Sequence, residues 1–270
     1  MAKRVVLIDC DDAVGKLWLE LPETILKLKS VLAQLKDDGT SVALFSAGDR
    51  AQLEPILQTL DISAPFIVES GSAIFTPIDQ NPFELPLGDR EGTYFVRQLG
   101  CPYVQARAGL RVVANMISHP LKGFGDFTIP QLQRLIGLSE AAAHQAKARE
   151  FSEPFMTPRA VEPAVLQQAA EAVGFKVIWR TAEENRFSEL VGADASLTAA
   201  VKILLGAYSS IDSSLARSLA VVGVSMNHSV LDELRIAAAT EGEIAFWDKP
   251  PVSGSVDSWI AAIESTGSMS

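Results

Sequence analysis

A hydrophobic segment that ends in acidic residues constrains the fold of this chain more than any other feature. Residues 5–8 read Val-Val-Leu-Ile, and Asp9, Cys10, Asp11 and Asp12 follow at once. Four consecutive aliphatic residues are typical of a strand buried on both faces of a sheet. Because an unpaired carboxylate is costly to bury, the acids should follow the carboxyl end of this strand, where open α/β sheets place their ligands. Asp9 and Asp11 could then bind a divalent cation, or act as a nucleophile and its acid/base partner. Alternatively, these acids have no chemical role and only cap the helix that follows.

The composition argues against several classes of protein. The chain has 270 residues and 48% hydrophobic content, which is enough for two domains with a sizeable core. Its 33 acidic and 23 basic residues leave a net charge of -10, which argues against nucleic-acid or anionic-membrane partners but not against a small anionic substrate. Two cysteines give no disulfide framework and no apolar run approaches ~18 residues, so we expect a cytoplasmic protein with no membrane span.

The first 77 residues alternate predicted strands and helices. Buried strands are predicted at 5–8, 41–45 and 65–68, with helices at 21–35 and 50–60 between them. This β-α-β-α-β order predicts a parallel sheet with right-handed crossovers.

The pattern then changes and later returns. Proline and glycine are frequent in residues 78–92, which we interpret as a linker, and buried-strand patterning reappears at 219–224. We therefore predict a core domain of residues 1–80 and 193–270, interrupted by a cap domain over 81–192. Shorter elements are predicted as helices at 102–117, 130–136, 138–148, 161–173, 197–205, 229–235 and 255–263, and as strands at 175–179, 186–191 and 236–239.

Polar residues follow three of the predicted strands, and in a parallel sheet all three strand ends lie at one edge. They are Asp9 and Asp11, then Ser46 and Arg50, then Ser225, Asn227 and His228. A carboxylate nucleophile, a second acid, a hydroxyl and a cation suit phosphoryl transfer. The carboxylate would attack phosphorus while the hydroxyl and backbone N–H groups hold the phosphate oxygens.

Several motifs resemble the haloacid dehalogenase (HAD) superfamily of phosphatases. Asp9-Cys10-Asp11 follows a strand, Ser46 follows the next strand, and a cap is inserted after them. Four segments are similar to the mannosyl-3-phosphoglycerate phosphatase branch: Glu69-Ser70-Gly71-Ser72-Ala73-Ile74, Ala148-Arg149-Glu150-Phe151-Ser152-Glu153-Pro154-Phe155, Phe124-Gly125-Asp126 and Arg186-Phe187. The resemblance covers nearly the whole chain, and the segment around Arg149 is its most specific part.

The resemblance implies an HAD-like Rossmannoid core with an α/β cap, and hydrolysis of a phosphorylated sugar-glycerate or small sugar phosphate. Asp9 matches the nucleophile that forms an aspartyl-phosphate, Asp11 the general acid/base, and Ser46 the hydroxyl that binds the phosphoryl group. Asp9 and Asp11 would also hold Mg²⁺. Together with the residues at the strand ends, the expected substrate-binding set is Arg50, Arg149, Glu153, Ser225 and Asn227.

The chain departs from the family at four positions. Ala13 replaces a threonine, Leu197 replaces a phosphate-binding lysine, and Val224 and His228 replace two acids. Valine supplies no oxygen ligand and histidine is a poor magnesium ligand, so the Mg²⁺ that the family implies is poorly supported by these residues. Removing one preorganised electrostatic group typically costs ~100- to 1000-fold in rate. The alternative function is therefore a catalytically impaired relative that binds a ligand or a partner protein.

Overall fold

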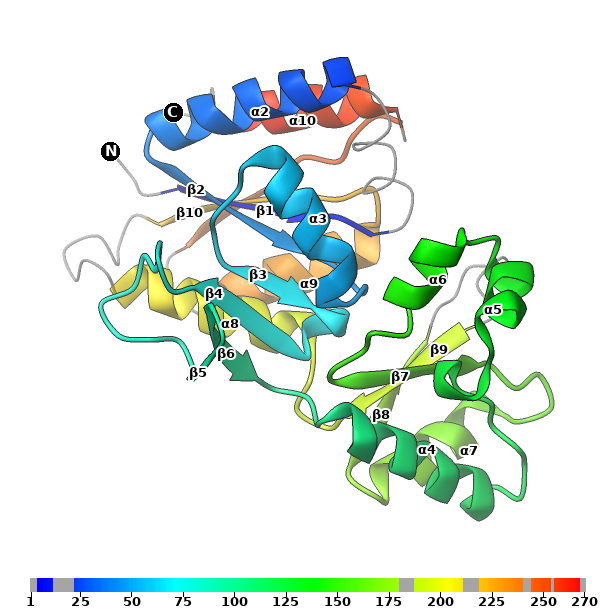
Figure 1. Cartoon of the computed structure of the whole chain (residues 1–270). Helices are drawn as coiled ribbons and strands as arrows, with labels where there is room; N and C mark the ends of the chain where they lie inside the picture. The colour runs from blue at the N-terminus through cyan, green and yellow to red at the C-terminus, as the bar shows by residue number, and fades with distance from the viewer. Residues whose placement is uncertain are drawn as a thin grey trace.

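The computed structural model describes residues 4–11, 22–179, 187–210, 219–239, 244–253 and 255–267. In these residues two β-sheets of different size are present, each with its own helices (Figure 1). The strands of the larger sheet are β1 (Arg4–Asp9), β2 (Thr40–Phe45), β3 (Phe66–Val68), β4 (Ala73–Pro77), β5 (Asp89–Glu91), β6 (Tyr94–Gln98), β10 (Ala220–Val224) and β11 (Ala245–Asp248). Their order is β11-β10-β1-β2-β3-β4-β6-β5, and the strands from β11 to β3 pair in parallel. The predicted α/β core with a mainly parallel sheet is confirmed.

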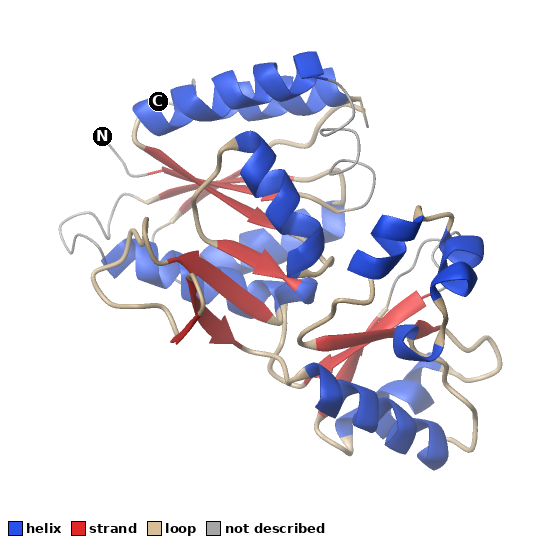
Figure 2. Cartoon of the chain, in the orientation of Figure 1, coloured by secondary structure: helices blue, strands red, loops and turns tan. Residues whose placement is uncertain are grey.

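Strand β1 lies in the middle of the parallel part, because it pairs with β2 on one side and β10 on the other. Its side chains alternate between two apolar clusters, with Val6 and Ile8 in one and Val5 and Leu7 in the other. Both faces of the sheet are covered by helices (Figure 2). The first cluster includes side chains from α2 (Pro22–Asp37), α3 (Arg50–Leu60) and α10 (Val256–Gly267), and the second from α8 (Leu197–Ser210) and α9 (His228–Ala239). Burial on both faces explains why this strand is uniformly aliphatic.

The larger sheet extends further along the chain than the sequence indicates. Residues 78–92 were expected to be a linker, yet they contain β5, and β6 follows directly. Both strands are antiparallel additions: β6 pairs with β4, and β5 pairs with β6. Without β6, strand β4 would be an exposed edge of the sheet, and the backbone N–H and C=O groups on that edge would be unpaired. The first strands beyond residue 80 therefore belong to the core sheet, while the predicted division into two domains stays a prediction.

The smaller sheet and its helices form what we call the cap region, residues 103–192. Its sheet has the order β7-β9-β8 and is antiparallel. The elements are α4 (Tyr103–Met116), α5 (Ile129–Ile136), α6 (Glu140–Gln145), β7 (Ser152–Met156), α7 (Pro163–Glu171), β8 (Phe175–Ile178) and β9 (Phe187–Gly192). Side chains of α4 and α7 share an apolar cluster with Phe155 and Leu190, and side chains of α5 and α6 pack with Phe187. No helix among the described residues has the length and apolar character needed to cross a membrane.

Two short elements near the C-terminus differ from the prediction. Residues 236–239 were predicted as a strand but belong to α9, in which Ala237 and Ala238 are buried while Ile236 is 56% exposed. The strand instead is β11, which pairs in parallel with β10. The apolar run at 236–239 was too short to distinguish a helix face from a buried strand.

Gly71, between β3 and β4, lies against the chain that leads out of the cap region, and its substitution should be costly. It has a φ of +85°, and a Cβ there would lie 2.2 Å from the backbone carbon and oxygen of Ser196. Gly71→Ala should therefore lower the free energy of unfolding by about 3 kcal/mol. Gly39 has a φ of +73° with no atom within 4 Å of such a Cβ, so Gly39→Ala should cost only about 1 kcal/mol. Equal losses in urea unfolding would contradict the close approach to Ser196.

Candidate active site

Asp9 is the last residue of β1, and both of its carboxylate oxygens are held by hydrogen bonds. The Ser225 hydroxyl donates to Oδ2 over 2.6 Å, and the backbone N–H of Asp11 donates to Oδ1 over 3.0 Å. Ser225 is fully buried and directly follows β10, the neighbour of β1. The carboxylate thus has a fixed orientation at the carboxyl edge of the sheet, with 7% of the residue exposed.

Asp11 contacts the turn that follows β2. Its Oδ1 accepts hydrogen bonds from the Ser46 hydroxyl over 2.8 Å and from the backbone N–H of Ala47 over 2.6 Å. The N–H of Gly48 in turn donates to the Ser46 oxygen over 2.8 Å. A hydroxyl and an N–H that converge on one anionic oxygen form a small anion-binding site. In this structure the Asp11 carboxylate occupies it.

The third strand end contributes Ser225 to the site, whereas Asn227 and His228 serve the start of α9. The N–H of Asn227 donates to the Ser225 hydroxyl oxygen over 3.0 Å. The Asn227 side-chain oxygen accepts from the N–H and the hydroxyl of Ser229, which is a local turn before the helix. His228 is the first residue of α9 and is exposed.

Arg50 opens α3 and contacts the segment that leads into the cap region. Its guanidinium donates to both carboxylate oxygens of Glu150, over 2.8 and 3.2 Å, and pairs with Glu54 at 3.4 Å. It also lies over the rings of Phe75 and Tyr94, with its central carbon 5.3 and 5.9 Å from their centroids. The contacts of Arg50 thus link the core to the cap region.

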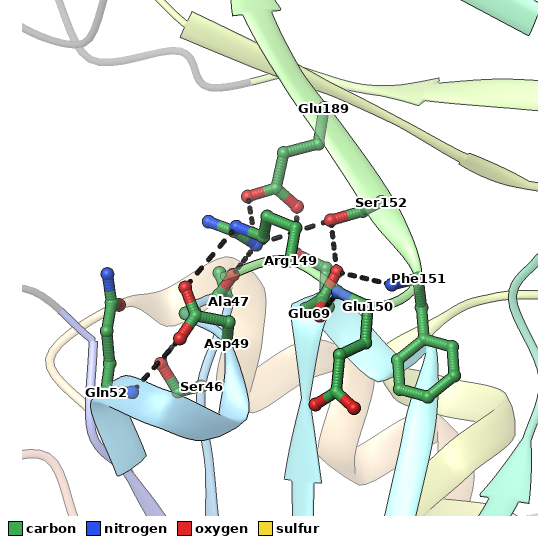
Figure 3. Close-up of polar contacts among 12 residues, drawn as sticks. Ser46, Ala47, Asp49, Gln52, Glu69, Arg149, Glu150, Phe151, Ser152 and Glu189 are labelled. Atoms are coloured by element: carbon green, nitrogen blue, oxygen red, sulfur yellow. Dashed lines mark hydrogen bonds and ion pairs between the residues drawn. The ribbon is translucent and has the colours of Figure 1, made fainter. Parts of the chain in front are cut away.

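Arg149 and Glu153, the two substrate-binding residues expected in the cap region, are both buried. The Arg149 side chain is 7% exposed and donates to the carbonyl oxygen of Ala47 over 2.7 Å (Figure 3). Glu153 accepts from the N–H of Gly125 over 3.0 Å and lies 3.5 Å from Arg107. Burial is the largest cause of the raised pKa of the Glu153 carboxyl. Both side chains are therefore held by protein groups.

Three buried acids lie where the core meets the cap region, and none of them was predicted as a site residue from the sequence. Glu69 and Asp49 are fully buried and Glu189 is 3% exposed. Glu69 accepts from the N–H groups of Glu150 and Phe151 over 2.9 and 3.1 Å. The only sequence signal for Glu69 was its place in a motif shared with the phosphatase family, because acids are usually exposed.

Comparisons with known proteins find relatives in sequence and in structure. No family model matches the chain. The glucosyl-3-phosphoglycerate/mannosyl-3-phosphoglycerate phosphatase of Persephonella marina is 31% identical over 173 residues, covering 64% of this chain and 62% of that protein. The mannosyl-3-phosphoglycerate phosphatase of Pyrococcus furiosus is 32% identical over 143 residues, covering 51% and 58%. The matched region thus spans less than two thirds of each of these relatives.

Solved structures decide the fold. A protein of Thermoplasma acidophilum superposes with a TM-score of 0.56 at 16% identity, covering 97% of this chain and 90% of that one. A HAD subclass IIB sugar phosphatase superposes with a TM-score of 0.55 at 10% identity, covering 98% and 99%. This chain has the HAD fold. Its curated homologues are mannosyl-3-phosphoglycerate phosphatases, as the sequence motifs indicated.

The Mg²⁺ that the family implies would be held by Asp9 and Asp11, which lie next to each other at the carboxyl edge of the sheet. Among the described residues of this HAD-fold protein, no group of three or more His, Cys, Asp or Glu side chains could hold a metal ion. Val224, where the family has an acid, is fully buried and packs in one apolar cluster with Val6, Ile8 and Cys10. Burial, followed by the charges of Asp9 and Asp11, raises the pKa of Cys10 well above its ordinary value, so this cysteine stays a thiol. Asp12 and Ala13 lie outside the described residues.

Glu69 should make the stability of the protein depend on pH. Burial raises the pKa of its carboxyl above the ordinary value of 4.5, so the folded protein holds this proton more tightly than the unfolded chain. The free energy of unfolding should therefore fall as the pH rises from 4.5 through the folded-state pKa, by at most about 1.4 kcal/mol per pH unit. The glutamine in Glu69→Gln does not titrate. The free energy of unfolding of the wild type, relative to that of this variant, should therefore fall over the same pH range. Parallel pH profiles in urea unfolding would contradict the effect.

Proposed function

We propose that this protein hydrolyses the phosphate monoester of a small sugar or sugar-glycerate through a phosphoryl intermediate on Asp9. The observation that carries the proposal is the convergence of Asp9, Asp11, Ser46 and Ser225 at one edge of the sheet. The names of the curated relatives make mannosyl-3-phosphoglycerate and glucosyl-3-phosphoglycerate the first substrates to test. Two free cysteines without a disulfide support a reducing, cytoplasmic setting.

The chemistry follows from the positions of the two carboxylates. An Asp9 oxygen attacks phosphorus, so that a new P–O bond forms while the bond to the sugar oxygen breaks. Asp11, in its protonated form, gives its proton to the leaving oxygen and later takes one from the water that attacks the phosphoryl-Asp9. For the substrate to bind, the phosphate must replace the Asp11 carboxylate on the Ser46 hydroxyl and the Ala47 N–H. That exchange also releases Asp11 to act on the leaving group.

The alternative function is a relative that binds a phosphorylated sugar, or a partner protein, with little or no turnover. The observation that favours it is the environment of the two replaced family residues. Val224 is buried among apolar side chains, and Leu197, at the start of α8, packs against the apolar cluster on the other face. Leu197 supplies no positive charge to offset phosphate repulsion, and Val224 supplies no oxygen ligand for a metal. Lys202 lies further along α8 and is half-buried.

Phosphate release separates the two functions. Purified protein would be assayed with both sugar-phosphoglycerates and with p-nitrophenyl phosphate, in magnesium and in EDTA. The proposal predicts release of stoichiometric phosphate from a sugar-phosphoglycerate at a rate well above that of p-nitrophenyl phosphate. Absence of release from all three compounds, combined with a thermal shift on adding a sugar-phosphoglycerate, would support the binding function and overturn the hydrolase. Activity that is equal in magnesium and EDTA would show that hydrolysis does not need the Mg²⁺ that the family implies.

A further inference from the structure

The core and the cap region meet through a buried charged cluster that the proposed chemistry does not use. On one side of it, the Glu69 carboxylate accepts three hydrogen bonds from the start of the cap sheet (Figure 3). The donors are the N–H groups of Glu150 and Phe151, over 2.9 and 3.1 Å, and the hydroxyl of Ser152, over 2.6 Å. Glu69 itself has a left-handed backbone with a φ of +50°, an uncommon conformation for a residue other than glycine. The strained backbone at Glu69 thus directs its carboxylate toward the cap region.

On the other side, Arg149 reaches from the cap region into the turn that carries Ser46. Its Nη1 donates to the carbonyl oxygen of Ala47 over 2.7 Å and lies 3.7 Å from an oxygen of Glu189. Its Nε lies 3.8 Å from Oδ2 of Asp49, and neither of these two atoms has a hydrogen-bond partner among the described residues. A movement of less than an ångström would convert this ion pair into a hydrogen bond. The charged cluster is therefore already assembled, and a small movement of the cap region toward the core would shorten the distance between Arg149 and Asp49.

The charge balance makes Arg149 indispensable to this contact. Asp49, Glu69 and Glu189 are buried acids, and Arg149 is the cation that approaches them in the described structure. Burial raises the pKa of both the Asp49 and the Glu69 carboxyl, and the charge of Arg149 is the largest effect that opposes it. Without Arg149, the closed arrangement would bury three acids with no compensating charge, which is strongly unfavourable.

The same contact connects the cap region to the catalytic acid. The Ala47 residue whose carbonyl accepts from Arg149 uses its own N–H to hold the Asp11 carboxylate. We infer that Arg149 is a positioning residue, which holds the cap region closed over the site and sets the turn at residues 46–49 that orients Asp11. Its effect on turnover rests on the proposed function, whereas its effect on closure does not.

Closure can be measured without substrate. Spin labels would be placed on cysteines introduced at Leu26 in α2 and Val165 in α7, which are 68% and 48% exposed, in a Cys101→Ser background. The parent should give one narrow distance distribution, and Arg149→Ala should give a broad distribution shifted to longer distances. Arg149→Lys, which keeps the charge but not the fork of donors, should lie between them. Arg107→Ala is the matched control, because Arg107 pairs with Asp126 and Glu153 inside the cap region, and it should leave the distribution unchanged.

Kinetics then distinguish positioning from substrate binding. If Arg149 positions the turn, Arg149→Ala should lower kcat about 100-fold with little change in KM, since small misplacements of catalytic groups have effects of this size. If Arg149 instead binds the substrate, KM should rise and the distance distribution should stay narrow. A narrow distribution in Arg149→Ala overturns the inference whether or not the protein is a phosphatase. If the distance distribution broadens in Arg149→Ala but the wild-type protein hydrolyses no substrate, the role of Arg149 in closure stands and only the proposed function is overturned.

Discussion

Replacing Asp9 with asparagine is expected to lower phosphate-ester hydrolysis by ~10⁴-fold or more, because an amide cannot form the phosphoryl intermediate. The substitution keeps the shape of a side chain that is held between the Ser225 hydroxyl and the N–H of Asp11. The fold should therefore survive, with a melting temperature close to that of the wild type. The measurement is phosphate release at saturating substrate, with circular dichroism as the check on folding.

Two further variants set the scale for that loss. Asp38→Asn changes an exposed acid beyond the end of α2 and should leave the rate unchanged. Ser225→Ala removes one hydrogen bond to Asp9 and should lower the rate about tenfold, in keeping with the value of a single hydrogen bond to a charged group. A rate for Asp9→Asn within tenfold of the wild type would rule out Asp9 as the nucleophile.

Introducing an acid at Val224, where the family has one, is expected to destabilise this protein rather than repair a metal site. Val224 is fully buried beside Ile8 in β1, and its side chain belongs to the apolar cluster that α2 and α10 cover. Val224→Asp would place a carboxylate there without a partner and should lower the free energy of unfolding by about 4 kcal/mol. Urea unfolding would measure the loss.

Val224→Ala provides the control for the lost volume. It should cost about 2 kcal/mol through the cavity alone, so the difference between the two variants reports the charge. Magnesium should leave the melting temperature of Val224→Asp unchanged. A magnesium-dependent rise in that temperature, absent from Val224→Ala, would show that position 224 faces a metal site after all.

The parts of the site that the sequence predicts are those governed by local pattern. The aliphatic run before Asp9 indicated a strand buried on both faces, and β1 is such a strand. Because parallel strands end at one edge, the residues after β2 and β10 could be expected near Asp9, and Ser46 and Ser225 are linked to Asp11 and Asp9 by hydrogen bonds. Each of these inferences needed only the period of a strand and the topology of the sheet.

The parts that the sequence does not predict depend on partners that are distant along the chain. β7 contains a proline and a buried acid, Glu153, and has no alternating apolar pattern. It is a strand because β9 pairs with it and because the N–H of Gly125 holds the Glu153 carboxylate. Arg149 looks like a substrate ligand in sequence, and its hydrogen bond to Ala47, 102 positions away, becomes evident only in the fold.

Trapping the phosphoryl group on the enzyme tests the central claim most directly. Wild-type protein would be mixed with excess mannosyl-3-phosphoglycerate, quenched in acid within a single turnover, digested and examined by mass spectrometry. We expect the peptide containing Asp9 to gain the mass of one phosphoryl group, this label to disappear when the substrate is exhausted, and Asp9→Asn never to acquire it. Substrate turnover with no phosphoryl group on that peptide, or with the group on a different residue, would show that Asp9 is not the nucleophile.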